Sequence, residues 1–220
     1  METEDIFRTT LSAGALRYGI TLDDAALDRF ERYTALIRDW NSRINLVSRG
    51  DLERFTGYHL LDSLKIACCF DFRNSEKILD FGSGAGLPGI PLALAFPHLS
   101  ISLVDSRMKR CIFLDEAIRA LGLDRVTAHW RRVEDLDQSW NGTFDAVTSR
   151  GTVSLETLFR SSSRLIRKGG SLIAIKGDSI DDELRTLFSA VDRSVFHILQ
   201  TAPPEVPGVR TGRIVLIAKI

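Results

Sequence analysis

Three glycines at every second position, Gly82, Gly84 and Gly86, form the part of the sequence best suited to bind a small molecule. They follow an apolar run that contains Asp80, and a second apolar stretch begins at Leu87. This order predicts a buried strand, a tight turn and the start of a helix. Glycine lets the backbone adopt positive φ and approach a ligand closely, and a helix start presents free N–H groups. We therefore expect the turn to hold an adenosine-bearing molecule against bare backbone.

The spacing of these glycines discriminates between two classes of adenosine-bearing ligand. A dinucleotide site has the pattern Gly-x-Gly-x-x-Gly, with a pyrophosphate at the helix N-terminus. Here the third glycine comes one residue earlier, and Asp80 stands just before the turn. A carboxylate would repel a pyrophosphate, but it would attract the cationic amino-acid part of S-adenosylmethionine. The motif therefore favours S-adenosylmethionine over NAD as the cofactor.

Further polar residues fall at the ends of the later predicted strands. In an open α/β sheet, ligands bind outside the carboxyl ends of the strands, so these residues are candidates for the site. The second strand ends in Asp105, about 20 residues beyond the glycine turn, where a carboxylate can accept hydrogen bonds from ribose hydroxyls. The third, fourth and fifth strands lead to cations, at Arg131 and Arg132, Arg150 and Lys176. Cations opposite a cofactor site suit a substrate that carries phosphate.

Each of these residues also has a purely structural interpretation. Asp105 could only cap the following helix, and Arg150 could only form a structural salt bridge. The Arg131–Arg132 pair could lie on a solvated loop, and Lys176 could be a surface lysine. His59 is interpreted as a helix-packing residue rather than as part of the site.

The elements that position these residues follow from the hydrophobic periodicity. Apolar residues step by three or four from Leu22 to Ile44, which predicts an amphipathic helix that Thr21 can cap. Strands are expected at Lys77–Phe81, Ser100–Asp105, Val126–Trp130, Phe144–Ser149, Ser171–Lys176, Phe196–Gln200 and Arg213–Lys219. Helices are expected at Pro88–Ala95, Arg107–Leu121, Leu155–Arg167 and Ile180–Ala190.

Strands that alternate with helices predict an α/β fold with a mostly parallel sheet. The Pro/Gly loop before the last strand is too short for a helix, so the last two strands should pair antiparallel. We therefore predict a Rossmann-like, seven-stranded sheet with one antiparallel strand, which resembles the class I methyltransferases. Residues 1–72 are expected to form an N-terminal helical extension, and residues 73–220 the S-adenosylmethionine-dependent methyltransferase domain.

Composition limits the partners and the cellular setting. The chain has 29 basic and 29 acidic residues, so a nucleic acid would have to bind a local patch rather than a general positive field. The three cysteines, Cys68, Cys69 and Cys111, have no metal-site spacing and are expected in the core of a protein in the reducing cytoplasm. No apolar run has the roughly 18 residues needed to cross a membrane. We expect a cytoplasmic protein that binds neither a metal nor a membrane.

Several motifs together resemble one family. DFGSGAGLPGIPLA followed by LVDSRMKRCIFL is similar to the bacterial small-subunit ribosomal RNA guanine-N7 methyltransferases, the RsmG/GidB family. The segments WNSRINLVS, HLLDSL, RVEDL, SRG and IKG are also similar, so the resemblance covers about residues 30 to 220. It implies transfer of a methyl group from S-adenosylmethionine to N7 of a guanine in small-subunit (16S) ribosomal RNA.

The resemblance also assigns roles to individual residues. It places cofactor contacts at Gly82, Leu87, Val133, Glu134 and Arg150. With the turn and the ribose-binding carboxylate, the expected cofactor site consists of Asp80, Gly82, Gly84, Gly86, Leu87, Asp105, Val133, Glu134 and Arg150. The residues expected to meet the substrate or to shape the catalytic site are Arg132, Arg150 and Lys176. Two positions depart from the family pattern, Tyr58 where a basic residue is frequent and Gly151 where alanine is usual.

The implied reaction needs few catalytic groups. N7 of guanine carries a lone pair and no proton, so it can attack the sulfonium methyl group in line without a general base. Catalysis then depends on holding N7 at near-attack distance, and Arg150 or Lys176 could donate to O6 of the guanine. A guanine in a single-stranded or loop context can present this edge.

The expected partner is therefore small-subunit ribosomal RNA or the ribosomal subunit, and we expect the chain to act as a monomer. Two alternatives stay open at this point. The chain could be an S-adenosylmethionine-dependent methyltransferase of a small molecule or a protein. It could also be a non-enzymatic, ribosome-associated module that binds the cofactor.

Overall fold

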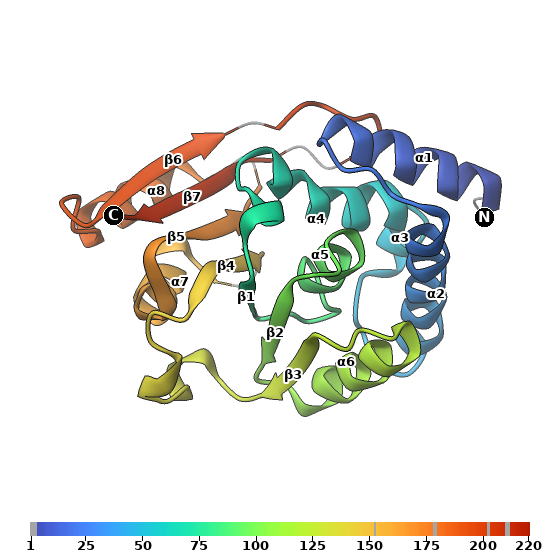
Figure 1. The fold of residues 1–220 in the computed structure, drawn as a ribbon, viewed down its shortest axis with the longest axis horizontal. Coiled ribbons are helices and arrows are strands. Elements are labelled where there is room, and N and C mark those ends of the chain that lie inside the picture. Colours follow the sequence, from blue (N-terminus) through green and yellow to red (C-terminus); the bar gives the residue numbers. More distant parts are fainter. Residues whose placement is uncertain (1–3, 152, 178–179, 202, 210–211) are drawn as a thin grey trace.

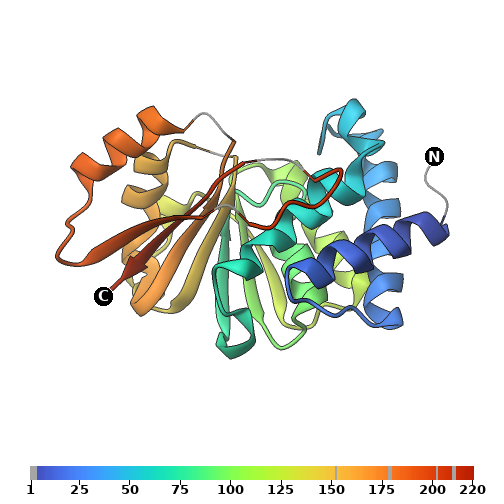
Figure 2. The same cartoon turned by 90° about the horizontal axis from the view of Figure 1, so that it is seen from above.

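A seven-stranded sheet with helices on both faces forms the centre of the molecule (Figures 1 and 2). The computed structural model describes residues 4–151, 153–177, 180–201, 203–209 and 212–220. The strands are β1 (Lys77–Phe81), β2 (Ser100–Asp105), β3 (Val126–Trp130), β4 (Phe144–Arg150), β5 (Ile166–Ile175), β6 (Phe196–Thr201) and β7 (Ile214–Lys219). The α-helices are α1 (Glu4–Arg17), α2 (Asp24–Asn41), α3 (Arg49–Leu52), α4 (Asp62–Leu64), α5 (Gly89–Ala95), α6 (Met108–Leu121), α7 (Leu155–Ser162) and α8 (Asp181–Ala190).

The strand order in the sheet is β3-β2-β1-β4-β5-β7-β6. Strands β3, β2, β1, β4 and β5 run parallel to their neighbours, and β7 is antiparallel to both β5 and β6. The predicted sheet with one antiparallel strand is therefore confirmed. The chain leaves β1 toward β2 on one side and later returns to β4 on the other. Ligands of open α/β sheets bind at this kind of switch point, outside the carboxyl ends of the strands.

The first three strands have the predicted bounds, whereas the region before β5 differs from the prediction. The helix expected to reach Arg167 ends at Ser162 and is followed by a 3-10 turn at Ser163–Leu165. As a result, β5 begins at Ile166 rather than at Ser171, and it ends at Ile175, one residue before the predicted Lys176. The other differences concern single ends: β4 extends to Arg150, β6 extends to Thr201, and β7, α5, α6 and α8 begin at Ile214, Gly89, Met108 and Asp181.

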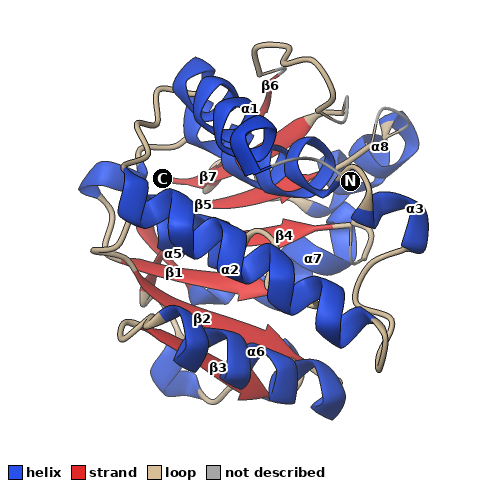
Figure 3. Cartoon of the chain, turned by 90° about the vertical axis from the view of Figure 1, so that its right-hand side faces the viewer, coloured by secondary structure: helices blue, strands red, loops and turns tan. Residues whose placement is uncertain are grey.

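Helices α5 and α6 cover one face of the sheet, with α4 packed beside α5, and Figure 3 shows α2 lying across that face. The predicted apolar stripe of α2 is buried, with Phe30, Tyr33 and Ile37 fully enclosed. These side chains share one apolar core with Leu92 of α5 and Phe113 of α6. The N-terminal helices are therefore packed into the core on one face of the sheet, to which strands β1 to β5 and β7 all contribute.

The start of α2 differs from the prediction. Its N-cap is Asp23, whose side chain accepts a hydrogen bond from the backbone N–H of Ala26 at 2.7 Å. Thr21 lies too early in the chain to cap a helix that begins at Asp24. A carboxylate at this position also interacts favourably with the helix dipole.

Helices α7 and α8 cover the opposite face of the sheet, over a second apolar cluster. The connection from β3 to β4 contains two 3-10 turns, η4 (Val133–Asp135) and η5 (Gln138–Trp140), and no α-helix. Strand β3 lies at the sheet edge, and its last residue, Trp130, is exposed.

The cysteines are less uniformly buried than expected. Cys111 is buried, but Cys69 is half-buried and Cys68 is exposed, so the prediction of three core cysteines is correct only for Cys111. The three thiols are free. Within the described ranges, no helix is both long and apolar enough to cross a bilayer.

Candidate cofactor and substrate site

A cavity of about 530 Å³ lies outside the carboxyl ends of β1, β2, β3 and β4. Its walls come from the glycine turn after β1, from residues 105–107 after β2, from residues 131–134 after β3 and from Arg150 and Gly151 at the end of β4. Leu46 and Val47 of the N-terminal region complete it. The volume falls within the range of pockets that hold small molecules, and the position matches the switch point of the sheet.

The glycine turn has the backbone conformation that its spacing predicts. Gly82, Gly84 and Gly86 have φ values of +67°, +58° and +87°. The N–H groups of Gly82 and Ser83 both donate to the carbonyl oxygen of Val104, which ties the turn to β2. Gly82 and Gly84 line the cavity, whereas Gly86 packs behind it: a Cβ atom on Gly86 would lie 2.4 Å from Cδ1 of Ile90. Gly86 therefore permits close packing of α5, and the other two expose backbone to a ligand.

Asp80 lies behind the turn and does not line the cavity. Its side chain is fully buried, and its two oxygens accept hydrogen bonds from the N–H of Gly89 at 3.1 Å and from Oγ1 of Thr148 at 3.2 Å. Burial raises the pKa of Asp80 to about 6, although these hydrogen bonds and the charge of Arg150 oppose the shift. The structure thus places Asp80 where it joins the first turn of α5 to β4, rather than in contact with a ligand in the cavity.

Asp105 faces the cavity and also holds the surrounding backbone. Its Oδ2 accepts from the N–H of Gly84 at 2.9 Å and from Arg110 at 3.4 Å, and its Oδ1 accepts from the N–H of Arg107 at 2.8 Å. Asp105 thus fixes the backbone at Gly84 and Arg107, but it does not cap α6, whose N-cap is Arg107 and has no side-chain cap. The contact of Asp105 with ribose hydroxyls stays a prediction. Since each carboxylate oxygen has two lone pairs, Oδ1 keeps the capacity to accept from a ligand hydroxyl.

Arg150 enters the cavity wall from a buried group of charged residues, which we call the inner charge cluster: His59, Asp62, Lys65 and Arg150. Arg150 donates from one nitrogen to Oδ2 of Asp62 at 3.2 Å and from the other to Nδ1 of His59 at 2.8 Å. Nζ of Lys65 lies 2.6 Å from Oδ1 of Asp62. A guanidinium group can only donate, so Nδ1 of His59 is the acceptor and the ring carries its proton on Nε2.

Sequence reasoning missed Asp62 and Lys65 and interpreted His59 as a packing residue. Asp62 is fully buried and Lys65 is 1% exposed. A charged pair three residues apart in an otherwise apolar segment was the available signal, because such charges are rarely buried unless they are paired. The structural interpretation of Arg150 as a salt-bridge residue is correct, and the same guanidinium also lines the cavity.

The N-terminal region supplies part of the wall through two specific contacts. The side-chain amide of Asn41 accepts from the N–H groups of Leu46 and Val47 and donates to the carbonyl oxygen of Val47, which fixes the loop that lines the cavity. The buried hydroxyl of Tyr33 donates to the carbonyl oxygen of Ala85 in the glycine turn at 2.6 Å. The sequence placed Tyr33 in the apolar stripe of α2 but predicted no contact with the glycine turn, and it predicted no role for Asn41, which lies within the WNSRINLVS motif.

The remaining predicted residues divide between the cavity and its surroundings. Leu87, Arg132, Val133 and Glu134 line the cavity. Lys176 does not: its Nζ donates to the carbonyl oxygen of Val153 at 2.5 Å and pairs with Glu183 at 2.9 Å. It supports the loop after β4. Glu134 accepts from the hydroxyl of Ser161, which holds the pKa of the Glu134 carboxyl below its usual value, so the carboxylate is ionised at neutral pH.

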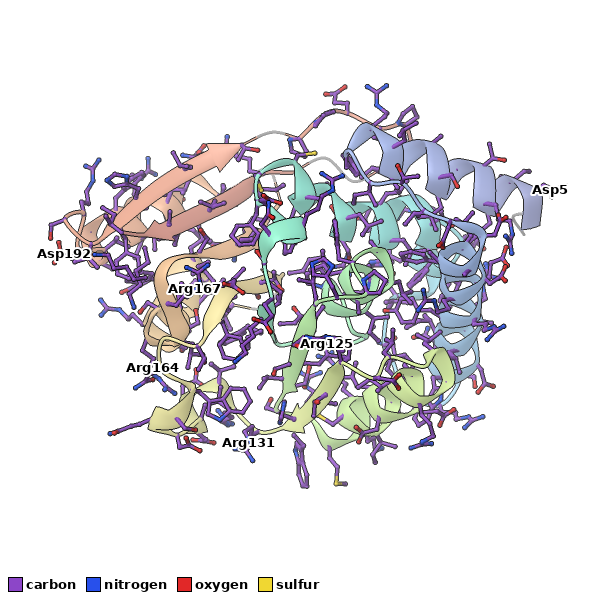
Figure 4. The ribbon with its side chains drawn as sticks, in the orientation of Figure 1. Asp5, Arg125, Arg131, Arg164, Arg167 and Asp192 are labelled. Atoms are coloured by element: carbon purple, nitrogen blue, oxygen red, sulfur yellow. The ribbon has the colours of Figure 1, made fainter. Side chains whose placement is uncertain are left out.

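Three arginines at the mouth of the cavity, Arg107, Arg131 and Arg132, form what we call the arginine rim. All three are exposed and line the cavity, and they form no ion pair with any described residue. Figure 4 shows Arg131 at the lower edge of the molecule, beyond the end of β3. With Arg110 and Arg150, five arginines line the cavity, and the described residues contribute two carboxylates to its wall, Asp105 and Glu134. A chain without net charge thus gathers positive charge at this site.

Comparison with known proteins identifies close relatives. A family model described as rRNA small subunit methyltransferase G (GidB) matches residues 26–202. The ribosomal RNA small subunit methyltransferase G of Roseiflexus castenholzii is 36% identical over 208 residues, which cover 94% of this chain and 88% of the relative. The protein of the same name from Chlorobaculum tepidum is 42% identical over 168 residues, 76% of each chain.

The fold also resembles that of solved methyltransferase structures. A predicted O-methyltransferase from Agrobacterium tumefaciens superposes with a TM-score of 0.54 over 68% of this chain and 76% of the other, at 20% sequence identity. This similarity, together with the strand order, confirms the expected class I methyltransferase fold.

Proposed function

Because the chain belongs to the rRNA small subunit methyltransferase G family, we propose that it transfers a methyl group from S-adenosylmethionine to N7 of a guanine in small-subunit ribosomal RNA. The proposal rests on one observation: a glycine turn and a group of arginines line the same cavity. A glycine turn with bare backbone forms its inner end, and five arginines surround the rest in a chain of zero net charge. The first suits an adenosine-bearing cofactor, and the second suits a polyanionic substrate.

The residues around the glycine turn fit the cofactor. Gly82 and Gly84 offer backbone without side chains, and Leu87 and Val133 offer apolar surface in the same cavity. Asp105 and Glu134 are the two carboxylates that can accept hydrogen bonds from hydroxyl or ammonium groups. When bound, S-adenosylmethionine supplies an electrophilic methyl group.

Arg150 is the residue proposed to orient the guanine. Among the described residues, two of its five N–H groups have partners, which leaves donors for the O6 atom of the base. Asp62 and His59 fix the guanidinium, so less orientational freedom is lost when the substrate binds. Because N7 carries no proton, the chain needs to provide no general base. Arg132 is proposed to contact the RNA, and Lys176 to position the loop at Val153.

The same reasoning extends to organisation and setting. We propose that the protein acts as a monomer in the cytoplasm, where ribosomal subunits are assembled. Residues 1–72 are proposed to be a helical extension that completes the cavity with Leu46 and Val47, and residues 73–220 the methyltransferase domain.

The activity itself is tested with ribosomal RNA from cells that lack this protein. Small subunits and protein-free ribosomal RNA from such cells are incubated with the purified chain and methyl-labelled S-adenosylmethionine, and nucleosides are then analysed by mass spectrometry. We expect label in 7-methylguanosine at one site. Label in protein or in small molecules, with none in RNA, would contradict the proposal and favour the alternative substrates. Cofactor binding without any transfer would favour a non-enzymatic module.

The role of Arg150 is tested with Arg150→Ala. Loss of a preorganised donor is expected to lower kcat/KM for ribosomal RNA by roughly 100-fold or more. Arg160→Ala is the matched control, because Arg160 is exposed and its one ion pair within the described part of the chain is with Glu156 on α7. Urea unfolding of both variants separates loss of catalysis from loss of fold. Equal activity of Arg150→Ala and the wild type would exclude the proposed role.

A further inference from the structure

Trp130 is a large apolar side chain that the fold leaves in solvent. It ends β3, at the edge of the sheet, and it is 61% exposed. The two other tryptophans are packed: Trp40 contacts Phe113, and Trp140 stacks on Phe144. Strand β3 contributes to the core through Val126, and the side chain of Trp130 is not part of that core.

The indole of Trp130 does not line the cavity itself, but it is held beside residues that do. Its Nε1–H donates to the carbonyl oxygen of Ser106 at 3.1 Å, and Ser106 lines the cavity. In the sheet register, Trp130 is paired with Asp105, the candidate ribose-binding residue. One edge of the ring is therefore anchored while much of its surface stays accessible. A rigid, accessible aromatic surface loses little conformational entropy when another planar group stacks on it.

The surroundings of Trp130 carry positive charge. Arg131 follows it in the chain, and Arg107 follows its hydrogen-bond partner Ser106. Both arginines belong to the arginine rim and form no ion pair with a described residue. Two more exposed apolar side chains, Met108 and Ile112, lie one helical turn apart at the start of α6. An anchored aromatic ring flanked by uncompensated arginines is the combination that binds unpaired nucleotides, with a base on the ring and phosphates on the cations.

We propose that Trp130, with Arg107 and Arg131, forms a stacking platform for an unpaired base of ribosomal RNA that neighbours the guanine in the cavity. This inference rests on the proposed function, because it assumes that RNA reaches the cavity mouth. The charge of the rim favours RNA over a second copy of the chain, which carries no net charge. The experiment below also distinguishes RNA from a protein that binds the same surface.

The experiment compares the wild type with Trp130→Ala, Trp130→Phe and the control Leu199→Ala. Leu199 is 55% exposed on β6, at the opposite edge of the sheet. Binding to a protein-free transcript of small-subunit ribosomal RNA is measured over a series of KCl concentrations. Cofactor affinity is measured by titration with S-adenosylhomocysteine, and self-association by analytical ultracentrifugation. Methyl transfer to unmethylated small subunits is measured in parallel.

Loss of one base stack is expected to weaken RNA binding by Trp130→Ala about tenfold. The slope of log affinity against log salt should not change, because no phosphate contact is removed. Trp130→Phe should retain most of the affinity, since a phenyl ring can still stack. Cofactor affinity should be the same in all four proteins, and Leu199→Ala should bind RNA as the wild type does.

Several results would overturn the platform. One is equal RNA affinity of Trp130→Ala and the wild type, and another is no binding of the transcript by the wild type. A loss seen only with assembled subunits would assign the surface to a ribosomal protein. A loss of self-association would assign the Trp130 surface to a second copy of the chain. A loss of cofactor affinity would assign it to the adenine of the cofactor. If the wild type methylates RNA and Trp130→Ala is unimpaired, only this inference fails. If the wild type transfers no methyl group to RNA, the proposed function fails.

Discussion

The inner charge cluster and the arginine rim both supply arginine to the cavity wall, but the arginine of the cluster is largely buried and paired, whereas those of the rim are exposed. Arg150 of the inner charge cluster is 15% exposed at its side chain and is bonded to Asp62 and His59. The rim arginines are exposed and have no ion-pair partner among the described residues. The inner charge cluster joins the N-terminal helical region to the end of β4, while the rim belongs to the loops after β2 and β3.

The difference indicates that the two groups serve different parts of one process. A buried charge must be compensated inside the protein, because the loss of hydration is otherwise too costly. Arg150 therefore has a fixed direction, which suits the orientation of a single base. An exposed guanidinium keeps its hydration and its mobility until a polyanion arrives, and its contribution then depends on salt. The inner charge cluster should determine stability and geometry, and the rim should determine RNA affinity.

The largest effect is expected when the inner charge cluster loses its only carboxylate. Asp62→Ala leaves Lys65, which is 1% exposed, and Arg150 without the anion between them. Removal of one partner from a buried ion pair typically costs about 3–5 kcal/mol. We expect a loss of this size in the free energy of unfolding, measured with urea.

A double variant and an exposed pair test this explanation. Asp62→Ala combined with Lys65→Met removes one of the two stranded charges and should recover part of the stability. Asp39→Ala breaks an ion pair with Arg43 in which both side chains are more than half exposed, and it should cost at most about 1 kcal/mol. Similar losses for Asp62→Ala and Asp39→Ala would remove the distinction between buried and exposed charges.

A second prediction concerns the pH dependence of the unfolding free energy that arises from Asp80, which is buried behind the glycine turn. The folded-state pKa of Asp80 is about 6, above its ordinary value of 3.8, because the side chain is buried. The folded protein therefore keeps a proton that the unfolded chain has released, and this stabilisation is lost as the pH rises through 6. Relative to Asp80→Asn, the wild type should lose about 2 kcal/mol of unfolding free energy between pH 4.5 and pH 7.5. Urea unfolding at both pH values measures this, and parallel profiles would show that Asp80 does not titrate as described.

The parts of the fold that could be predicted are those encoded by local pattern. Strands β1 to β3 have their predicted bounds because each is a short apolar or alternating segment between turn residues. The glycine turn was predictable because positive φ is strongly disfavoured for other residues, and the three glycines have it. The cap of α2 was predicted at Thr21 and found at Asp23, since two capping residues stood close together and only the packing of the helix selects one.

The inner charge cluster could not be predicted because its contacts are long-range. Arg150 and Asp62 are 88 positions apart, and no periodicity connects a strand end to a helix that precedes the sheet. Lys176 fails as a cavity residue for a different reason: its amine is bonded to Glu183 of α8, which is only seven positions away but competes with the cavity for this cation. Strand ends predict which residues are near a site, whereas competing partners decide which of them remain free to act.

The smallest effects on stability are expected for variants of the arginine rim, and their salt dependence gives a numerical comparison with the inner charge cluster. Arg107→Ala and Arg132→Ala remove exposed side chains without ion pairs among the described residues, so the free energy of unfolding should change by at most about 0.5 kcal/mol. If each guanidinium contacts one phosphate, each variant should lower the slope of log RNA affinity against log salt by about 1. The variants should therefore bind RNA a few-fold more weakly at low salt and converge with the wild type as salt increases. A stability loss similar to that of Asp62→Ala would mean that the rim is part of the fold. An unchanged salt slope would mean that these arginines do not contact phosphate.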